Sequence, residues 1–198
     1  MGTIFCIMGK SSTGKDTIYR ELLAREELKL DRIVTYTTRP IRGSEKEGVE
    51  YHFTTEAYEE ELKAAGKIIE SRSYMTMHGR WDYFMADDGQ IEPDRDYLII
   101  STLESYLSIK DYYKDMKIEP IYIYVEDGIR LDRALSRERR QPEPKYREMC
   151  RRYLADCDDF SEEKLANAGV RDDHIFENHS VEETVAAITS FIEKVRRS

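Results

Sequence analysis

A short buried strand that leads directly into a glycine-rich turn and a helix is the feature that most restricts how this chain can fold. Thr3–Met8 form a nearly continuous apolar run that ends at Gly9, the pattern of a strand buried on both faces of a parallel sheet. The next segment places Ile18, Leu22 and Leu23 on one helical face. This order predicts the first unit of a layered α/β domain.

Strand and helix patterns continue to alternate along the chain, and they predict an α/β fold of three layers with a parallel sheet. The other strand candidates are Ile33 to Tyr36, Tyr97 to Ser101, Ile118 to Val125 and a short segment near His174 to Phe176. Ser180 and Glu183 form a capping box that predicts the start of the last helix.

The segment from Thr35 to about Pro93 differs from the rest of the chain. It is polar, rich in tyrosine and turns, and has one clear helix, Glu56 to Ala65, which Gly66 ends. We interpret it as an inserted subdomain within a single domain. The predicted boundaries are residues 1–34 and 94–198 for the core and 35–93 for the insert.

Composition narrows the classes of function. A net charge of −9 gives little support for general binding to nucleic acid, and no apolar run is long enough for a membrane span. The first apolar stretch lacks the basic leader and cleavage site of a signal peptide, which predicts a cytoplasmic protein. Cys6, Cys150 and Cys157 are interpreted as reduced core residues.

Residues 9–15 match the Gly-x4-Gly-Lys pattern of the Walker A phosphate loop. The glycines let backbone N–H groups surround a phosphate, the helix N-terminus adds partial positive charge, and Lys15 reaches the outer phosphates. The predicted ATP-binding residues of this segment are Gly9, Lys10, Ser11, Ser12, Thr13, Gly14, Lys15, Asp16 and Thr17.

The residue after Lys15 departs from this motif, which has Ser or Thr there, because the chain has Asp16 followed by Thr17. A carboxylate at this position can hold Mg²⁺ directly or through water, but without the ion it repels the phosphates. Asp16 and Thr17 are therefore the predicted metal ligands. The alternative is a glycine-rich turn with a solvated lysine, in which Asp16 is merely favoured by the first helical turn.

A second motif extends from Thr37 to Phe53. It contains Thr37-Thr38-Arg39, a second arginine at Arg42, and Tyr51-His52-Phe53. With the phosphate loop, it resembles the guanylate kinase family of P-loop nucleoside monophosphate kinases, of which the chain would be a divergent member. The resemblance implies a P-loop kinase fold, with ATP and GMP as ligands and Mg²⁺ as cofactor.

Two arginines three residues apart in a turn-rich segment can grip one phosphate, and Tyr51 can donate a third hydrogen bond. Arg39, Arg42 and Tyr51 are therefore the predicted clamp for the phosphate of the acceptor, as the resemblance also implies. The resemblance further places Thr35 near the base. The alternative is that the arginines are turn residues paired with neighbouring glutamates, Glu45 or Glu47.

The resemblance implies three more substrate-binding residues, although the match is looser. Glu70 corresponds to a carboxylate that accepts hydrogen bonds from the guanine edge, and Tyr83 to a phosphate-binding tyrosine. Thr102 stands where the family has the second carboxylate of Asp-x-Asp, and Ile100 replaces the first. The departure affects both base selection and metal handling. A bland alternative for Glu70 is an exposed residue that ends a strand.

Arg130, Arg133, Arg137 and Arg140 recur at helical spacing and are expected to share one face. A second helix follows Pro142 and Pro144, with an apolar stripe at Tyr146, Met149, Cys150, Tyr153, Leu154 and Cys157. We interpret the connection, about 137–147, as a lid. The resemblance implies catalytic roles for Arg133, Arg137 and Arg152 beside Lys15, and places Asn178 near the adenine. The alternative is a solvated basic face.

The sequence thus predicts ATP-dependent phosphoryl transfer to a nucleoside monophosphate, GMP to GDP in the simplest case. Small-molecule nucleotides are the expected partners, without nucleic acid or membrane, and the oligomeric state stays open. Two alternatives also remain. One is a non-catalytic guanylate-kinase-like module that binds proteins, and the other is a kinase for another small phosphorylated acceptor.

Overall fold

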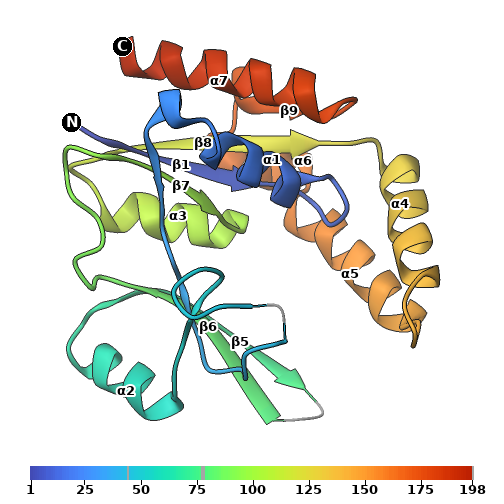
Figure 1. Ribbon diagram of the computed structural model, residues 1–198, viewed down its shortest axis with the longest axis horizontal. Helices are drawn as coiled ribbons and strands as arrows, with labels where there is room; N and C mark the ends of the chain where they lie inside the picture. Colours follow the sequence, from blue (N-terminus) through green and yellow to red (C-terminus); the bar gives the residue numbers. More distant parts are fainter. Residues whose placement is uncertain (44, 77–78, 198) are drawn as a thin grey trace.

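The computed structural model describes residues 1–43, 45–76 and 79–197, and a five-stranded parallel sheet lies at its centre (Figure 1). The strands lie in the order β2 (Leu30–Arg32), β7 (Asp96–Ile100), β1 (Thr3–Met8), β8 (Lys117–Tyr124) and β9 (Ile175–Glu177). β1 pairs in parallel with both β7 and β8, and every residue of it is buried. Its continuous apolar run therefore does mark a central strand, as predicted.

Helices cover both faces of this sheet (Figure 1). α1 (Lys15–Leu23) and α7 (Val181–Arg197) bury Ile18 and Ile188 against one face, on the side of Phe5. α3 (Leu103–Tyr112) and α6 (Glu162–Asn167) pack on the other face, on the side of Cys6. Alternate residues of β1 thus enter two separate cores, which confirms the predicted three-layer α/β fold. Two short 3₁₀ helices complete this part, Glu26–Leu28 and Asp172–His174.

A second, smaller sheet lies below the first in Figure 1. Its strands follow the order β4 (His52–Phe53), β3 (Tyr36–Thr37), β6 (Gly79–Ala86) and β5 (Ile68–Thr76). β5 and β6 pair antiparallel, and α2 (Glu56–Ala64) contributes Leu62 to a small core with Tyr36, Phe84 and Ala86. This sheet holds the motif that begins at Thr37.

The prediction of one strand over Ile33 to Tyr36 is wrong, because the chain crosses from one sheet to the other there. β2 ends at Arg32 and β3 begins at Tyr36. Between them, the Val34 N–H donates to Gln90 Oε1 at 2.8 Å, and the Val34 carbonyl accepts from Gln90 Nε2 at 3.2 Å. Ile33 and Val34 are buried, so their apolar pattern imitates a strand, while a side-chain amide satisfies the backbone of Val34.

α4 (Asp127–Arg139) and α5 (Tyr146–Asp159) form an arm on the right of Figure 1. α5 packs against α4 rather than into a core, and none of its residues is fully buried. Leu154 is 64% exposed and Cys150 is exposed. The predicted apolar stripe of α5 is therefore not a core face, and the prediction that all three cysteines are core residues holds only for Cys6.

Among the described residues, no helix has the length and apolar character needed to cross a bilayer.

Candidate active site

The phosphate loop connects β1 to α1, and its glycines are required by close approach. A Cβ on Gly9 would lie 2.7 Å from the carbonyl oxygen of Ile123, and a Cβ on Gly14 would lie 2.7 Å from Asn178 Nδ2. Gly14 also has a φ of 88°, a region that side chains disfavour. The loop therefore packs directly on the end of β8 and on Asn178, as the predicted glycine spacing requires.

The remainder of the loop is held by hydrogen bonds from side chains. Thr13 Oγ1 donates to the Lys10 carbonyl at 2.9 Å, and Asn178 Nδ2 donates to the Thr13 carbonyl at 2.7 Å. Thr184 Oγ1 donates in turn to Asn178 Oδ1 at 3.2 Å. Asn178 is 5% exposed, so the structure makes it a support for the loop and gives its amide partners other than an adenine.

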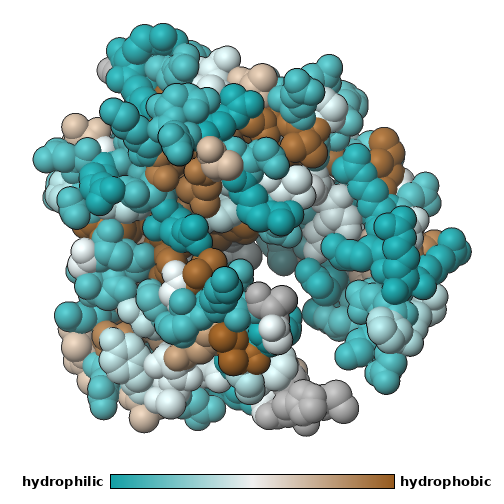
Figure 2. Space-filling model, in the orientation of Figure 1, coloured by the Kyte–Doolittle hydropathy of each residue, from teal (hydrophilic) through white to brown (hydrophobic). Residues whose placement is uncertain are grey.

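Lys15 and the loop form one wall of a cleft of about 600 Å³, here called the main cleft. Tyr51 from the second sheet, Thr102 after β7, and Arg152 of the arm line the same cleft. Figure 2 shows this face of the molecule hollowed between the second sheet and the arm. Residues predicted for ATP, for the acceptor and for catalysis thus meet around one space.

Burial lowers the pKa of Lys15, and the nearby carboxylates of Asp16 and Asp156 act in the opposite direction. The ammonium group therefore occupies a partly desolvated position, where its attraction to a phosphate is less screened than in water. Asp16 itself is exposed at the first turn of α1.

The predicted acceptor clamp contains one arginine that is already paired. Arg39 is 3% exposed and donates from both terminal nitrogens to Glu45, at 2.7 and 2.6 Å. Its Nε donates to the Tyr83 hydroxyl at 3.1 Å, and its guanidinium lies 5.1 Å from the centre of the Tyr51 ring. The hydrogen bonds from Arg39 lower the pKa of Glu45 to about 2. Arg39 therefore organises Tyr51 and Tyr83.

Arg42 has a different environment from Arg39. Its side chain lines a second cavity of about 440 Å³, here called the arm cavity. Ser11 of the loop, Arg137 of α4 and Arg152 of α5 line the same cavity. Of the two predicted clamp arginines, Arg42 is thus the one that faces the loop and the arm.

Glu70, the residue predicted to bind the base, is paired with Arg72. The two side chains on β5 make a bidentate pair, with Nε to Oε2 at 3.1 Å and Nη2 to Oε1 at 3.2 Å. Thr102 is the N-cap of α3 and accepts from the Ser105 N–H at 3.2 Å. The Thr35 carbonyl accepts from the His52 N–H at 2.9 Å.

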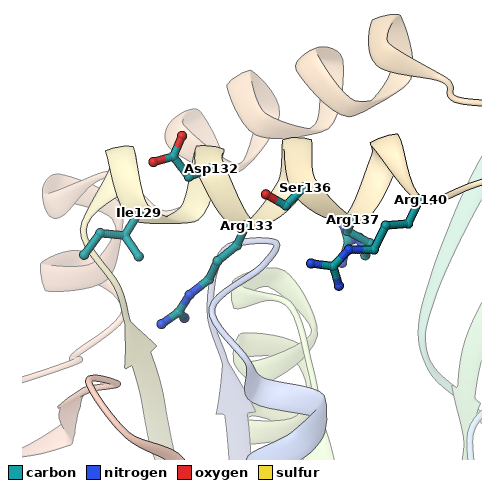
Figure 3. Close-up of a pocket in the computed structure, with 6 residues that line it drawn as sticks. All are labelled: Ile129, Asp132, Arg133, Ser136, Arg137 and Arg140. Carbon is teal, nitrogen blue, oxygen red and sulfur yellow. The ribbon is translucent and has the colours of Figure 1, made fainter.

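The predicted arginine face of α4 is divided in the structure. Arg133, Arg137 and Arg140 line a groove of about 440 Å³ along α4 (Figure 3), whereas Arg130 is 1% exposed. Arg130 still lines the arm cavity together with Arg137, so what differs from the expectation is its burial, because it is not part of an exposed basic face. On α5, Arg152 Nη2 lies 3.4 Å from Ser11 Oγ.

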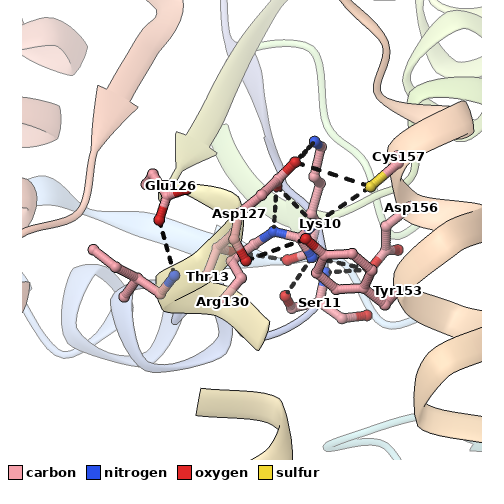
Figure 4. Close-up of polar contacts among 10 residues, drawn as sticks. Lys10, Ser11, Thr13, Glu126, Asp127, Arg130, Tyr153, Asp156 and Cys157 are labelled. Atoms are coloured by element: carbon pink, nitrogen blue, oxygen red, sulfur yellow. Dashed lines mark hydrogen bonds and ion pairs between the residues drawn. The ribbon is translucent and has the colours of Figure 1, made fainter. Parts of the chain in front are cut away.

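Arg130 is the buried member of a partly buried polar network that sequence reasoning missed (Figure 4). Its Nη1 donates to the Ser11 carbonyl at 3.1 Å, and its Nε and Nη2 donate to Asp127 Oδ1 at 3.0 and 2.8 Å. Lys10 Nζ donates to the same carboxylate at 3.2 Å. Asp156 Oδ2 accepts from the Ser11 N–H at 2.7 Å. These contacts tie both helices of the arm to the phosphate loop.

The residues at the start of α1 fit a magnesium ion. Mg²⁺ takes oxygen ligands and is usually held by one or two carboxylates together with substrate phosphates. Asp16 is exposed beside Lys15, no ion pair among the described residues uses its carboxylate, and the Thr17 hydroxyl follows it. The described residues contain no group of three or more His, Cys, Asp or Glu side chains suited to a metal, so phosphates would have to complete the shell.

Comparison with known proteins points to one family. Residues 1–88 match the sequence model for guanylate kinase. The chain is 40% identical over 74 residues to a guanylate kinase of Mycoplasmoides gallisepticum, covering 37% of this chain and 38% of that protein. It is 35% identical over 74 residues to one of Streptococcus pyogenes, covering 37% and 35%. Residues 1–88 are therefore similar in sequence to the guanylate kinases.

The likeness in sequence and the likeness in fold differ in extent. The matched segments span little more than a third of these curated guanylate kinases, 38% and 35%. The crystal structure of a guanylate kinase from Anaplasma phagocytophilum covers 100% of this chain and 87% of that one, with a TM-score of 0.63 and 19% identity. The segment that matches the family model, residues 1–88, includes the phosphate loop and the predicted clamp. The arm lies beyond this segment, and there the likeness is one of fold alone.

Proposed function

We propose that this chain transfers a phosphoryl group from ATP to a nucleoside monophosphate, with GMP as the first acceptor to test. The observation that carries the proposal is the main cleft, which Lys15, Tyr51 and Arg152 line together. The likeness of residues 1–88 to guanylate kinases supports the same activity. Lys15 is the residue most suited to the phosphates of ATP, because it extends from the loop into this cleft.

The reaction requires side chains that position the substrates and supply positive charge, and it does not require a general base. The second pKa of a phosphate is near 6, so the acceptor is already mostly ionised at pH 7. Arg42 and Tyr51 would hold its phosphate, while Arg137 and Arg152 would approach the transferred group from the arm. Two mutually repelling anions are then held in line by cations, which is the main requirement of phosphoryl transfer.

Mg²⁺ fits the same scheme through Asp16 and Thr17, where it would neutralise phosphate charge and orient the outer phosphates. The exposed Asp16 carboxylate supplies the negative charge that binds the ion. Arg133 lies in the groove along α4 beside Arg137, from which it would add to the positive field of the arm.

The test is ATP-dependent ADP formation with a panel of monophosphates, GMP, dGMP, IMP, AMP, CMP and UMP, checked by detection of the diphosphate product. Lys15→Ala should lower turnover by more than about a hundredfold, because the loop loses its phosphate cation. The matched control is Lys114→Ala, which removes an exposed lysine paired with Asp111. Absence of any nucleoside diphosphate product would reject a nucleoside monophosphate kinase and leave the two alternatives, a protein-binding module and a kinase for another small phosphorylated acceptor. Turnover only with a non-nucleotide acceptor would assign a different kinase.

A further inference from the structure

Arg72, rather than Glu70, lines the main cleft at β5, the strand where the resemblance to guanylate kinases places the acceptor base. Arg72 lines the cleft, and its side chain is 27% exposed, whereas the side chain of Glu70 is 7% exposed. Alternate residues of a strand share a face, so the two side chains and Tyr74 project from the same side of β5. The guanidinium therefore lies over the carboxylate and separates it from the cleft.

Arg72 changes this part of the cleft wall from a hydrogen-bond acceptor to a hydrogen-bond donor. Both oxygens of Glu70 accept from Arg72, through Oε2 to Nε and Oε1 to Nη2. A guanidinium has five N–H donors and no acceptor. Two of these donors are used by Glu70, and no other residue in the described part of the chain accepts a hydrogen bond from the Arg72 guanidinium. The wall thus offers donors where an uncovered carboxylate would offer acceptors.

A purine base responds to this change in a specific way. The N1–H and 2-amino group of guanine are donors and would need the carboxylate as acceptor. The O6 and N7 atoms are acceptors, and they are common to guanine and hypoxanthine, so an arginine can bind either base through them. Adenine carries a donor, its 6-amino group, in place of O6. This wall therefore favours purines with a 6-oxo group and makes no hydrogen bond that depends on the 2-amino group.

We propose that Arg72 is the residue that sets base selectivity, and that the cleft accepts 6-oxopurine monophosphates, GMP and IMP alike, while disfavouring AMP. The inference rests on the proposed function for the identity of the reaction. Its own content is the small discrimination between GMP and IMP, which differ only in the 2-amino group. Glu70 becomes a reader of guanine only when Arg72 is removed.

The experiment measures the ratio of kcat/KM for GMP to that for IMP. In the wild type the ratio should lie within about threefold of one, and AMP should be at least about tenfold poorer than either. Arg72→Ala exposes the Glu70 carboxylate, which then accepts from the 2-amino group and should raise the GMP/IMP ratio about tenfold. The double variant Arg72→Ala with Glu70→Gln should return the ratio to the wild-type value.

The matched control is Arg151→Ala. Arg151 lines the same cleft but pairs with Glu148, so its removal takes away one unit of charge and leaves Glu70 covered. The GMP/IMP ratio should then not change, whatever happens to either rate. A wild-type ratio above about thirty, or a ratio that moves equally in Arg72→Ala and Arg151→Ala, would overturn the inference.

Equilibrium binding separates this inference from the proposed function. If no monophosphate is phosphorylated, the proposed function fails, and the Kd values of GMP and IMP measured by calorimetry still give the ratio for all four proteins. If turnover occurs but the ratio does not respond to Arg72, only the inference fails. The wild-type GMP/IMP ratio tests the inference without any variant, so the test remains valid even if Arg72→Ala folds poorly.

Discussion

The carboxylate of Asp156 accepts a 2.7 Å hydrogen bond from the backbone N–H of Ser11. The donor belongs to the phosphate loop, whose N–H groups are the natural partners of a bound phosphate, and the acceptor belongs to α5. Arg130 reinforces the contact, because it donates to the Ser11 carbonyl and lies 3.7 Å from the same carboxylate. The arm therefore places a negative oxygen where a nucleotide phosphate would seek the same donor.

Removing this carboxylate should strengthen ATP binding. Asp156→Ala frees the Ser11 N–H and removes a charge that repels phosphate, so we expect ATP·Mg²⁺ to bind more tightly by about 1–2 kcal/mol, a factor of roughly 5 to 30. Calorimetric titration at pH 7 measures the change. The control is Asp159→Ala, which removes an acid from the same helix and the same cleft; among the described residues Asp159 pairs with Lys164 and not with the loop. Equal changes in both variants would mean that only net charge matters.

The Asp156 carboxylate should also shift the alkaline limit of the reaction, which is set by the pKa of Lys15. Burial lowers the pKa of Lys15 below its ordinary value of 10.5, and Asp156 partly offsets this effect. Because the charged lysine binds phosphate, kcat/KM should fall as pH rises through the lowered pKa. Asp16 and Asp156 both raise this pKa, Asp16 more strongly, and Asp156→Asn removes the part due to Asp156, so the falling limb should move to lower pH. The measurement is the pH profile of kcat/KM for ATP above pH 7, with Asp159→Asn as control. A limb that stays in place or moves upward contradicts the assignment.

The parts of the site that depend on local sequence could be predicted without a structure. The loop, β1 and α1 depend on spacings within one short segment, and the structure confirms them as one strand, turn and helix. The pairing of Glu70 with Arg72 also left a signal, since opposite charges two residues apart on a strand share a face. Sequence reasoning assigned Glu70 to the base and did not weigh its neighbour.

The parts of the site that depend on tertiary contacts could not be predicted from the sequence. Asp156 and Ser11 are 145 positions apart, and no local pattern pairs them. Arg130 has the same spacing as its three neighbours on α4, and only the packing of α5 turns it inward against Tyr153, 4.5 Å from the ring centre. The stripe on α5 has helical periodicity, but the arm offers no core to bury it, so Leu154 stays exposed.

Asp16 should make ATP binding unusually dependent on magnesium. Its carboxylate follows Lys15 directly, so without the cation it faces the phosphates as a like charge, and with the cation it is a ligand. We expect Mg²⁺ to improve ATP affinity more in the wild type than in Asp16→Ser, by about tenfold or more. Titrations of ATP with Mg²⁺ and with EDTA in both proteins give the comparison. The same magnesium effect in the two proteins would remove Asp16 from the metal site.

The pair of Arg39 and Glu45 should contribute stability that depends on pH. The hydrogen bonds from Arg39 lower the pKa of Glu45 from 4.5 to about 2. A carboxylate whose folded pKa is lowered stabilises the fold above its unfolded pKa, and this contribution is lost as pH falls through the folded value. Glu45→Gln should therefore cost about 1–2 kcal/mol at pH 7, and the difference from wild type should shrink between pH 4.5 and 2.

Thermal unfolding at several pH values measures this difference. Glu50→Gln is the control, because Glu50 is exposed in the same turn and accepts only from the Lys46 N–H in the described contacts. A destabilisation by Glu45→Gln that stays constant down to pH 2 would assign the effect to packing rather than to the charge.

Acceptor binding should separate the two arginines of the clamp. Arg42 faces the arm cavity, whereas Arg39 is buried and committed to Glu45 and Tyr83. A charge-assisted hydrogen bond contributes about 1.5–3 kcal/mol, so Arg42→Ala should raise the KM of the monophosphate by about 10 to 150 times and leave the KM of ATP and the unfolding temperature nearly unchanged. Arg39→Ala should raise the same KM but also lower the unfolding temperature, because it leaves Glu45 unpaired. Steady-state kinetics with both substrates and thermal unfolding measure these effects. The control is Arg25→Ala, which removes an arginine paired with Glu27 away from the site. A rise in both KM values in Arg42→Ala would contradict a clamp role for Arg42.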